Sequence, residues 1–296
     1  MPTYGYDQDV RLSFAVMATP RMTRLRAYRD GRPFGAPFEF TTMTDPDAFI
    51  GFIAKAILAF IARTPGASVV EVGLAVAGQL DQDRHHIVRA GRLQTLVHRP
   101  LADMLSRALG GARVSLGNDA FTKVYYEGIH NPAVSGLSFF GIYIGEGFGS
   151  AFSLIGTDGK RETIEVEAGH IKVPGTNKRI KCPCGGEDHL DVIAGGRVLG
   201  SDPNLTPTCK RAVWLPYVGA MAAVISMLLK ERPVDRLLIG GQRTELHPRM
   251  RFFLKEAIEE LMGDNTPQFA RSVLHFAPAE AASVLFKESD LVSAGA

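Results

Sequence analysis

The sequence predicts a mixed α/β protein with two β-rich lobes and a cleft between them. Apolar strand-like segments alternate with amphipathic helical segments, the second half of the chain repeats the order of the first, and no low-complexity tract interrupts them. At 296 residues the chain is long enough for each lobe to bury a core. We place the N-terminal lobe at residues 1–120 and the C-terminal lobe at residues 121–278. A closing helix at about 279–296 is expected to pack back on the N-terminal lobe.

The N-terminal lobe is expected to begin with a β-meander. Asp30-Gly31 is a hairpin turn signal between two strand-like runs. Asp45-Pro46-Asp47 then begins a helix in which apolar residues recur at helical spacing. The expected strands lie at 10–17, 24–28, 34–42, 69–77 and 113–116, and the later helices at 100–109 and 121–127.

The C-terminal lobe continues the alternation of strands and helices. The apolar run from Trp214 to Leu229 is too short and too rich in Gly, Ala and Ser for a membrane span, so we interpret it as a core helix. The expected strands lie at 137–144, 149–155, 236–239 and 273–276, and the helices at 209–231, 248–262 and 279–286.

Composition narrows the classes of partner and compartment. A formal net charge of +2 gives no sign of a nucleic-acid or membrane-surface partner. The chain has three cysteines, of which Cys209 stands apart from the other two, so a disulfide framework is not expected. Residues 1–9 are polar and do not resemble a signal peptide. We therefore expect a cytoplasmic protein.

Residues 167–195, EAGHIKVPGTNKRIKCPCGGEDHLDVIAG, contain four candidate metal ligands. His170 is followed after eleven residues by Cys182, after one more by Cys184, and after four more by His189. Two thiolates and two imidazoles form a tetrahedral donor set suited to Zn²⁺, and four protein ligands are typical of a structural rather than a catalytic site. The alternative is a pair of buried free cysteines and two surface histidines.

This segment resembles the zinc motif of the ROK family (repressors, open reading frames, kinases). The family pattern is Glu-x-Gly-His, followed by Cys-x-Cys-Gly-x-x-Gly-Cys-x-Glu. His189 replaces the third cysteine and is still a zinc donor, Asp188 replaces the preceding glycine, and Asp191 replaces the final glutamate. The matching positions are Glu167, Gly169, His170, Cys182, Cys184 and Gly185.

The resemblance covers most of the chain and implies an actin-like, ribonuclease H-like sugar kinase fold. It also implies roles for Asn118 and Asp119, which match the family's Asn-Asp-Ala motif. There the aspartate is the general base that takes a proton from the attacking sugar hydroxyl, and the asparagine contacts the sugar. The alternative for Asp119 is a helix N-cap, because an aspartate before a helix commonly accepts backbone N–H groups.

Further sugar contacts follow from the resemblance. Glu167 would accept hydrogen bonds from two vicinal hydroxyls, although a solvated charge at a strand end is the alternative. His170 would serve both the sugar and the metal, and Gly78 would lie close to the ligand. Asp191 would reach a sugar hydroxyl with a side chain one methylene shorter than the family's glutamate. Arg92 stands where the family has a sugar-contacting asparagine, and it either favours an anionic sugar or points to solvent.

The phosphate-handling motifs of the family are altered in this chain. The Asp-x-Gly-Gly-Thr turn falls on residues 16–20, VMATP, which contain no carboxylate and no glycine pair, and Pro20 lacks a backbone N–H. The Gly-Thr-Gly motif has Glu146 in place of its threonine, and like charges about 4 Å apart cost on the order of 4 kcal/mol at an effective dielectric constant of roughly 20. We therefore expect a degenerate nucleotide site, at which binding of Mg-ATP is doubtful. Its remaining glycines are Gly145, Gly147, Gly149, Gly240 and Gly241.

Two functions are compatible with these residues. The first is a protein that binds a small-molecule sugar on a sugar kinase scaffold, with weak or lost ATP-dependent phosphoryl transfer, acting as a sensor, a regulator or an altered enzyme. The alternative is an active ATP-dependent hexose-type sugar kinase with Asp119 as general base. A DNA-binding repressor is disfavoured, because the chain begins directly with the first strand and leaves no basic helix over. The resemblance also implies a homodimer that contains structural Zn²⁺.

Overall fold

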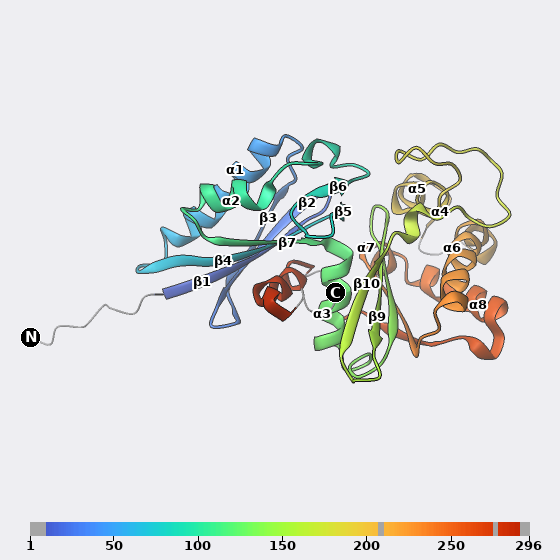
Figure 1. The fold of residues 1–296 in the computed structure, drawn as a ribbon. Coiled ribbons are helices and arrows are strands. Elements are labelled where there is room, and N and C mark those ends of the chain that lie inside the picture. The colour runs from blue at the N-terminus through green and yellow to red at the C-terminus, as the bar shows by residue number, and fades with distance from the viewer. Residues whose placement is uncertain (1–9, 207–209, 275–277, 291–296) are drawn as a thin grey trace, which may run out of the picture. The chain divides into compact units, whose positions relative to one another are not determined.

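The computed structural model describes residues 10–206, 210–274 and 278–290, and Cys209 lies outside these ranges. The described chain divides into two compact units (Figure 1). Unit 1 contains residues 10–122 and 278–290, and unit 2 contains residues 123–274. The division falls inside helix α3 (Asp119–His130). The alternation of strands and helices predicted for both halves of the chain is present.

Unit 1 is built on a five-stranded sheet in the described part of the chain, in the order β3-β2-β1-β4-β7. The first three strands form the predicted antiparallel meander, and β4 and β7 extend it as parallel strands beside β1. The bounds are β1 (Val10–Ala18), β2 (Met22–Arg29), β3 (Arg32–Thr41), β4 (Ala67–Val76) and β7 (Arg113–Asn118). A short hairpin, β5 (Gln79–Leu80) and β6 (Ile87–Arg89), follows β4.

The two faces of this sheet are covered by different elements (Figure 1). Helices α1 (Pro46–Ile61) and α2 (Leu101–Ala108) enclose a core with the even-numbered side chains of β1. Asp45 begins α1 as predicted, because its Oδ1 accepts the N–H of Ala48 at 2.8 Å. The 3₁₀ helix η4 (Pro278–Asp290) lies on the opposite face, where a Cβ at Gly73 would lie 2.3 Å from the carbonyl oxygen of Ala282. Glycine is therefore required there for the close approach of η4.

Unit 2 repeats the sheet order of unit 1. Its five described strands run β10-β9-β8-β11-β12, again an antiparallel meander extended by two parallel strands. Helix α6 (Arg211–Glu231) and helix α8 (Pro248–Met262) enclose a core on one face. The strands are β8 (Phe139–Ile144), β9 (Phe148–Ile155), β10 (Arg161–Val166), β11 (Arg236–Gly240) and β12 (Gln268–Arg271). The shorter helices of unit 2 are α4 (Leu190–Ala194), α5 (Gly196–Ser201) and α7 (Gln242–Leu246), with the 3₁₀ turns η2 (Ala168–His170) and η3 (Gly263–Asn265). The 3₁₀ turn η1 (Gln94–Leu96) belongs to unit 1.

Helix α6 is long and apolar enough to cross a membrane by length and composition. Within unit 2, however, 56% of its most apolar window is buried. Trp214, Met221 and Ile225 are among its residues with almost no exposed surface. This burial is that of a core helix.

The predicted strand at 273–276 is wrong at Val273 and Leu274, and its residues 275 and 276 lie outside the described residues. The last strand of the sheet is β12, five residues earlier, and the described residues Val273 and Leu274 follow it outside any strand. The apolar run that prompted the prediction serves packing and hydrogen bonding instead, since Leu274 is buried and the N–H of Val273 bonds to a side chain of α3. Strand β10 was not predicted, because its sequence RETIEV contains only two strongly apolar residues.

Candidate functional site

Asn118 ends β7 and caps the helix that follows it. Its Oδ1 accepts the N–H groups of Ala120 and Phe121, both at 2.8 Å, and its Nδ2 donates to the carbonyl oxygen of Gly78 at 2.8 Å. The capping role considered for Asp119 therefore belongs to Asn118. Asp119 is the first residue of α3, where the helix dipole favours a carboxylate. The end of β7 thus presents the Asn-Asp pair as the strand-to-helix junction of unit 1.

Gly78 is brought to the same junction by the hairpin β5–β6. A Cβ at Gly78 would lie 2.9 Å from Cγ2 of Ile87 and 3.0 Å from the carbonyl oxygen of Arg89. Packing against this hairpin is therefore a sufficient reason for glycine here. Arg92 is half-buried in the bend that precedes η1.

Arg84 is a residue of this region that the sequence motifs did not single out. It lies at the tip of the β5–β6 hairpin, with its Cζ 4.0 Å from the centroid of the Phe121 ring in the first turn of α3. The hairpin is closed by Asp81, whose Oδ1 accepts the N–H groups of His85 and His86. A cation–π contact of this kind depends on two segments far apart in sequence, so no local pattern announces it.

The turn between β1 and β2 consists of Thr19, Pro20 and Arg21. The hydroxyl of Thr19 donates to the carbonyl oxygen of Met22 at 2.9 Å and accepts the N–H of Met22 at 3.1 Å. The carbonyl oxygen of Thr19 accepts the hydroxyl of Thr42 at 2.7 Å. The hydroxyl and the carbonyl oxygen of Thr19 are thus engaged, and Pro20 supplies no N–H. The turn has neither a carboxylate nor a glycine, and the exposed Arg21 is its charged side chain.

The four candidate metal ligands come together in unit 2. One donor atom from each of His170, Cys182, Cys184 and His189 lies within 4.8 Å of all the others. Nδ1 of His170 lies 3.6 Å from Sγ of Cys182, and Nδ1 of His189 lies 3.1 Å from Sγ of Cys184. Zn–S distances near 2.3 Å and Zn–N distances near 2.0 Å in a tetrahedron place neighbouring donors about 3.3–3.8 Å apart. The four donors are gathered closely enough to hold a metal ion such as Zn²⁺.

The chain around these ligands is shaped for a tight turn. Gly185 has φ +97°, and a Cβ at Gly186 would lie 2.3 Å from Cε1 of His189. The buried carboxylate of Asp188 accepts the N–H groups of Ile180 at 3.0 Å and Arg179 at 3.2 Å. Burial alone would raise the pKa of Asp188, but these two backbone hydrogen bonds, with the charge of Lys172 and the N–H of Lys178, lower that pKa. Asp188, which replaces a family glycine, thus ties the two sides of the turn together.

Glu167 directly precedes the turn η2, and His170, the first of the candidate metal ligands, ends it. Nε2 of His170 lies 3.9 Å from Oε2 of Glu167, while its Nδ1 faces Cys182. The two ring nitrogens of His170 therefore face different groups, which is compatible with the double role expected for this histidine. The side chain of Glu167 is 36% exposed, so its carboxylate is accessible to a ligand.

Asp191 connects the metal segment to the glycine turn at 145–149. Its Oδ1 accepts the N–H of Phe148 at 2.8 Å. A Cβ at Gly147 would lie 2.8 Å from its carboxylate, and a Cβ at Gly169 would lie 2.5 Å from it. The carboxylate of Asp191 thus lies between Gly147, in the turn at 145–149, and Gly169, in the segment that contains the candidate metal ligands. Sequence reasoning considered only a sugar contact for Asp191 and missed this link.

The two predicted phosphate turns also meet in unit 2. Gly241 has φ +101°, and a Cβ there would lie 2.6 Å from both the backbone N and O of Ile144, the residue before Gly145. The carbonyl oxygen of Glu146 accepts the N–H of Arg197 at the start of α5. Gly240 and Gly241 are therefore packed against the base of the Gly145–Gly149 turn.

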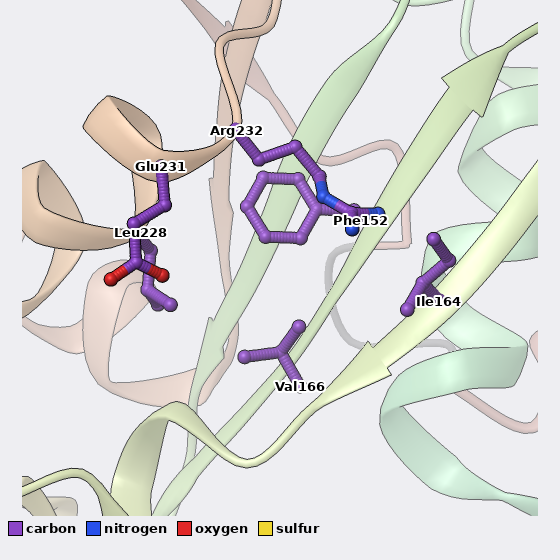
Figure 2. Close-up of a pocket in the computed structure, with 6 residues that line it drawn as sticks. All are labelled: Phe152, Ile164, Val166, Leu228, Glu231 and Arg232. Carbon is purple, nitrogen blue, oxygen red and sulfur yellow. The ribbon is translucent and has the colours of Figure 1, made fainter.

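The apolar hollow shown in Figure 2 lies elsewhere in unit 2, between strands β9 and β10 and the end of α6. Its volume is about 230 Å³, and the guanidinium of Arg232 extends over the ring of Phe152, with its Cζ 5.6 Å from the ring centroid. The residues that line it are Phe152, Ile164, Val166, Leu228, Glu231 and Arg232. None of the predicted site residues is among them.

Comparison with known sequences gives a family and a relative. The sequence profile described as the ROK family matches residues 40–204, more than half of the chain. A glucokinase from Aeropyrum pernix is 31% identical over 134 residues, which are 44% of this chain and 40% of that relative. The match thus spans less than half the length of the curated relative.

Solved structures show the same fold over nearly the whole chain. A ROK family glucokinase from Streptomyces griseus, in complex with glucose and AMPPNP, has a TM-score of 0.72 at 18% identity, covering 92% of this chain and 98% of that one. The ROK hexokinase from Thermus thermophilus has a TM-score of 0.70 at 20% identity, covering 95% and 99%. At these identities the likeness establishes the mixed α/β fold of the ROK sugar kinases.

Proposed function

The chain belongs to the ROK family, and we propose that it binds a sugar or sugar derivative on a sugar kinase scaffold whose ATP-dependent phosphoryl transfer is weak or lost. The observation that carries the proposal is the β1–β2 turn. The hydroxyl and carbonyl oxygen of Thr19 bond to Met22 and Thr42, and the turn offers neither a carboxylate for Mg²⁺ nor glycine N–H groups for phosphate. Such a protein acts as a sensor, a regulator or an altered enzyme.

The sugar side of the proposal concerns each unit by itself. In unit 2, Glu167, His170 and Asp191 are the residues proposed to bind hydroxyls. In unit 1, Gly78, Asn118 and Asp119 are the residues proposed to contact a sugar. Support comes from the 36% exposure of the Glu167 side chain, directly before the candidate metal ligands. Arg92, at an asparagine position of the family, would favour an anionic sugar such as a sugar acid.

Structural zinc completes this proposal. His170, Cys182, Cys184 and His189 would hold the ion, and its chemistry would be to fix the segment that presents Glu167 rather than to activate a substrate. The support is the donor set itself, together with a glycine at 186 that leaves room for the His189 ring.

A thermal-shift experiment with a panel of neutral and acidic sugars, with and without Mg-ATP, tests the proposal. A sugar at about 100 times its Kd stabilises the folded protein by about 2.7 kcal/mol, which is readily measured. We expect stabilisation by at least one sugar and none by Mg-ATP. A protein that no sugar stabilises contradicts the proposal.

The alternative function is an active ATP-dependent hexose-type kinase in which Asp119 is the general base. It is favoured by the close packing of Gly241 against Ile144, which keeps both glycine turns together. In that case Asp119 takes the proton of the attacking hydroxyl as the oxygen bonds to the transferred phosphoryl group. Sugar-dependent ADP release that disappears in Asp119→Asn would establish this function.

A further inference from the structure

Unit 2 contains a buried carboxylate that none of the proposed binding steps uses. Glu127 lies in the second half of α3, and its side chain is fully buried. Helix α3 packs on the sheet face opposite α6, since a Cβ at Gly141 of β8 would lie 2.6 Å from Cγ2 of Val124. A carboxylate buried in this way is costly unless several donors surround it.

Four donors converge on the carboxylate of Glu127. Oε1 accepts the hydroxyl of Tyr143 at 3.0 Å and the hydroxyl of Ser272, and Oε2 accepts Nδ2 of Asn131 at 2.7 Å. The N–H of Val273 lies 3.0 Å from Oε1 and 3.2 Å from Oε2. Burial, and then the negative charge of Glu127, raise the pKa of Tyr143 well above its ordinary value, so that its hydroxyl stays a donor. We call these five residues the Glu127 cluster.

The donors of the cluster stand where parallel strands end. Strands β8, β11 and β12 are parallel, Tyr143 is the penultimate residue of β8, and Ser272 directly follows β12. Gly240, the last residue of β11, lies between them. A Cβ at Gly240 would lie 2.8 Å from Cβ of Ser272 and 2.9 Å from Cε1 of Tyr143. Ligands of open α/β sheets bind at these carboxyl ends of strands.

We propose that Glu127 is a positioning residue that holds the turns at 145–149 and 240–242 in one register. The inference rests on the proposed function, because it takes these turns as the nucleotide side of the scaffold. Tyr143 lies two residues before the first turn, and Gly240 opens the second. Glu127 bonds Tyr143 and Ser272 directly, and it reaches Gly240 only through these two side chains, which lie close to the α-carbon of that glycine. Networks of this kind lose more than one hydrogen bond when a member is changed.

Hydrogen-exchange mass spectrometry of the ligand-free protein tests this role with Glu127→Gln. Glutamine keeps the size of the side chain but replaces one accepting oxygen with an NH₂ group, which is a donor. This NH₂ group would then face Nδ2 of Asn131 or the N–H of Val273. Both of these groups are donors as well, so their hydrogen bonds would be lost. We expect the amide hydrogens of residues 143–149 and 240–244 to exchange about tenfold faster or more. A tenfold change corresponds to a loss of about 1.4 kcal/mol in the free energy of local opening. Residues 182–189 and strands β1 and β4 should exchange as in the wild type.

Two further variants keep the test specific. Tyr143→Phe removes one donor of the cluster and should loosen the same two turns by a smaller factor. Tyr217→Phe removes another tyrosine–carboxylate hydrogen bond of unit 2, 2.6 Å to Asp202, and should leave both turns unchanged. Exchange that rises uniformly across unit 2, or that does not rise at the two turns, overturns the proposal. No ligand is added in this experiment, so the exchange rates do not depend on whether the protein binds a sugar. Failure to bind any sugar would contradict the proposed function but would leave the exchange result unchanged.

Discussion

The turn between β1 and β2 in unit 1 and the turn between β8 and β9 in unit 2 occupy the same place in two sheets of the same strand order. The first is Thr-Pro-Arg and is closed by threonine hydroxyls. The second is Gly-Glu-Gly, in which the N–H of Gly145 bonds to the carbonyl oxygen of Gly147. Two turns in the same topological position therefore differ in the chemical groups that they offer to a ligand. In unit 1 proline removes one backbone donor and the Thr19 hydroxyl engages the N–H of Met22, whereas in unit 2 the glycine backbone is retained and an added carboxylate opposes an anion.

The largest expected effect concerns the metal segment, which we propose keeps the ligand side of unit 2 rigid. In the double variant Cys182→Ser and Cys184→Ser, metal content should fall from about one equivalent per chain to almost none. The melting temperature should drop by about 10 °C or more, because metal affinity is part of the folding free energy. Elemental analysis and calorimetry measure both changes.

The third cysteine provides a matched control for this prediction. Cys209→Ser makes the same chemical change at a position beyond the 167–195 segment in the sequence, and it should leave metal content unchanged. A metal-free wild type that is fully folded would contradict the zinc assignment.

The second prediction isolates the charge of the unit 2 turn. Glu146→Gln removes a carboxylate that would repel a triphosphate by up to about 4 kcal/mol, so Mg-AMPPNP should bind more tightly, by as much as about a thousandfold. Titration calorimetry measures the change. Glu162→Gln, which removes an exposed carboxylate of β10, is the control. Unchanged affinity in Glu146→Gln would show that the charge is not the obstacle.

The third prediction compares a glycine that the fold requires with a glycine at which a larger side chain would meet no neighbouring atom. Gly241→Ala should lower the free energy of unfolding by about 3 kcal/mol, because φ is +101° and the new Cβ would meet the backbone of Ile144. Gly145→Ala has no heavy atom within 4 Å of the new Cβ and should cost no more than about 0.5 kcal/mol. Urea denaturation compares the two. Equal destabilisation would contradict the packing described between the two turns.

The smallest effect is expected in the unit 1 turn. Thr19→Val keeps the shape of the side chain but removes both hydrogen bonds to Met22, and should cost about 1–2 kcal/mol. Thr19→Ser keeps the hydroxyl and should stay close to the wild type. If valine is tolerated as well as serine in denaturant titrations, the turn is not held closed by this side chain.

The sequence predicted elements and motifs whose signals are local. The Asp45 cap of α1, the strand at 236–240 and the spacing of the Cys and His donors could all be recognised within a short window. The misplaced last strand shows the limit, because Val273 and Leu274 are apolar yet serve a buried cluster rather than a sheet.

Contacts between segments far apart in the chain could not be predicted from the sequence. Asp191 was considered only as a short sugar ligand, and its bond to the N–H of Phe148 depends on how two loops of unit 2 fold together. The cap of α3 was assigned to Asp119 in one interpretation, whereas Asn118 provides it. The buried role of Glu127 was not seen, because its partners lie up to 146 residues away.

The central claim is that the protein binds a sugar although its ATP-dependent phosphoryl transfer is weak or lost. Measuring ADP release tests this claim most directly. Wild type and Asp119→Asn should be assayed with Mg-ATP and the sugar that gives the largest thermal stabilisation. The account predicts that the wild type releases ADP no faster than Asp119→Asn. Rapid sugar-dependent release by the wild type, absent from Asp119→Asn, would contradict it and establish a working kinase.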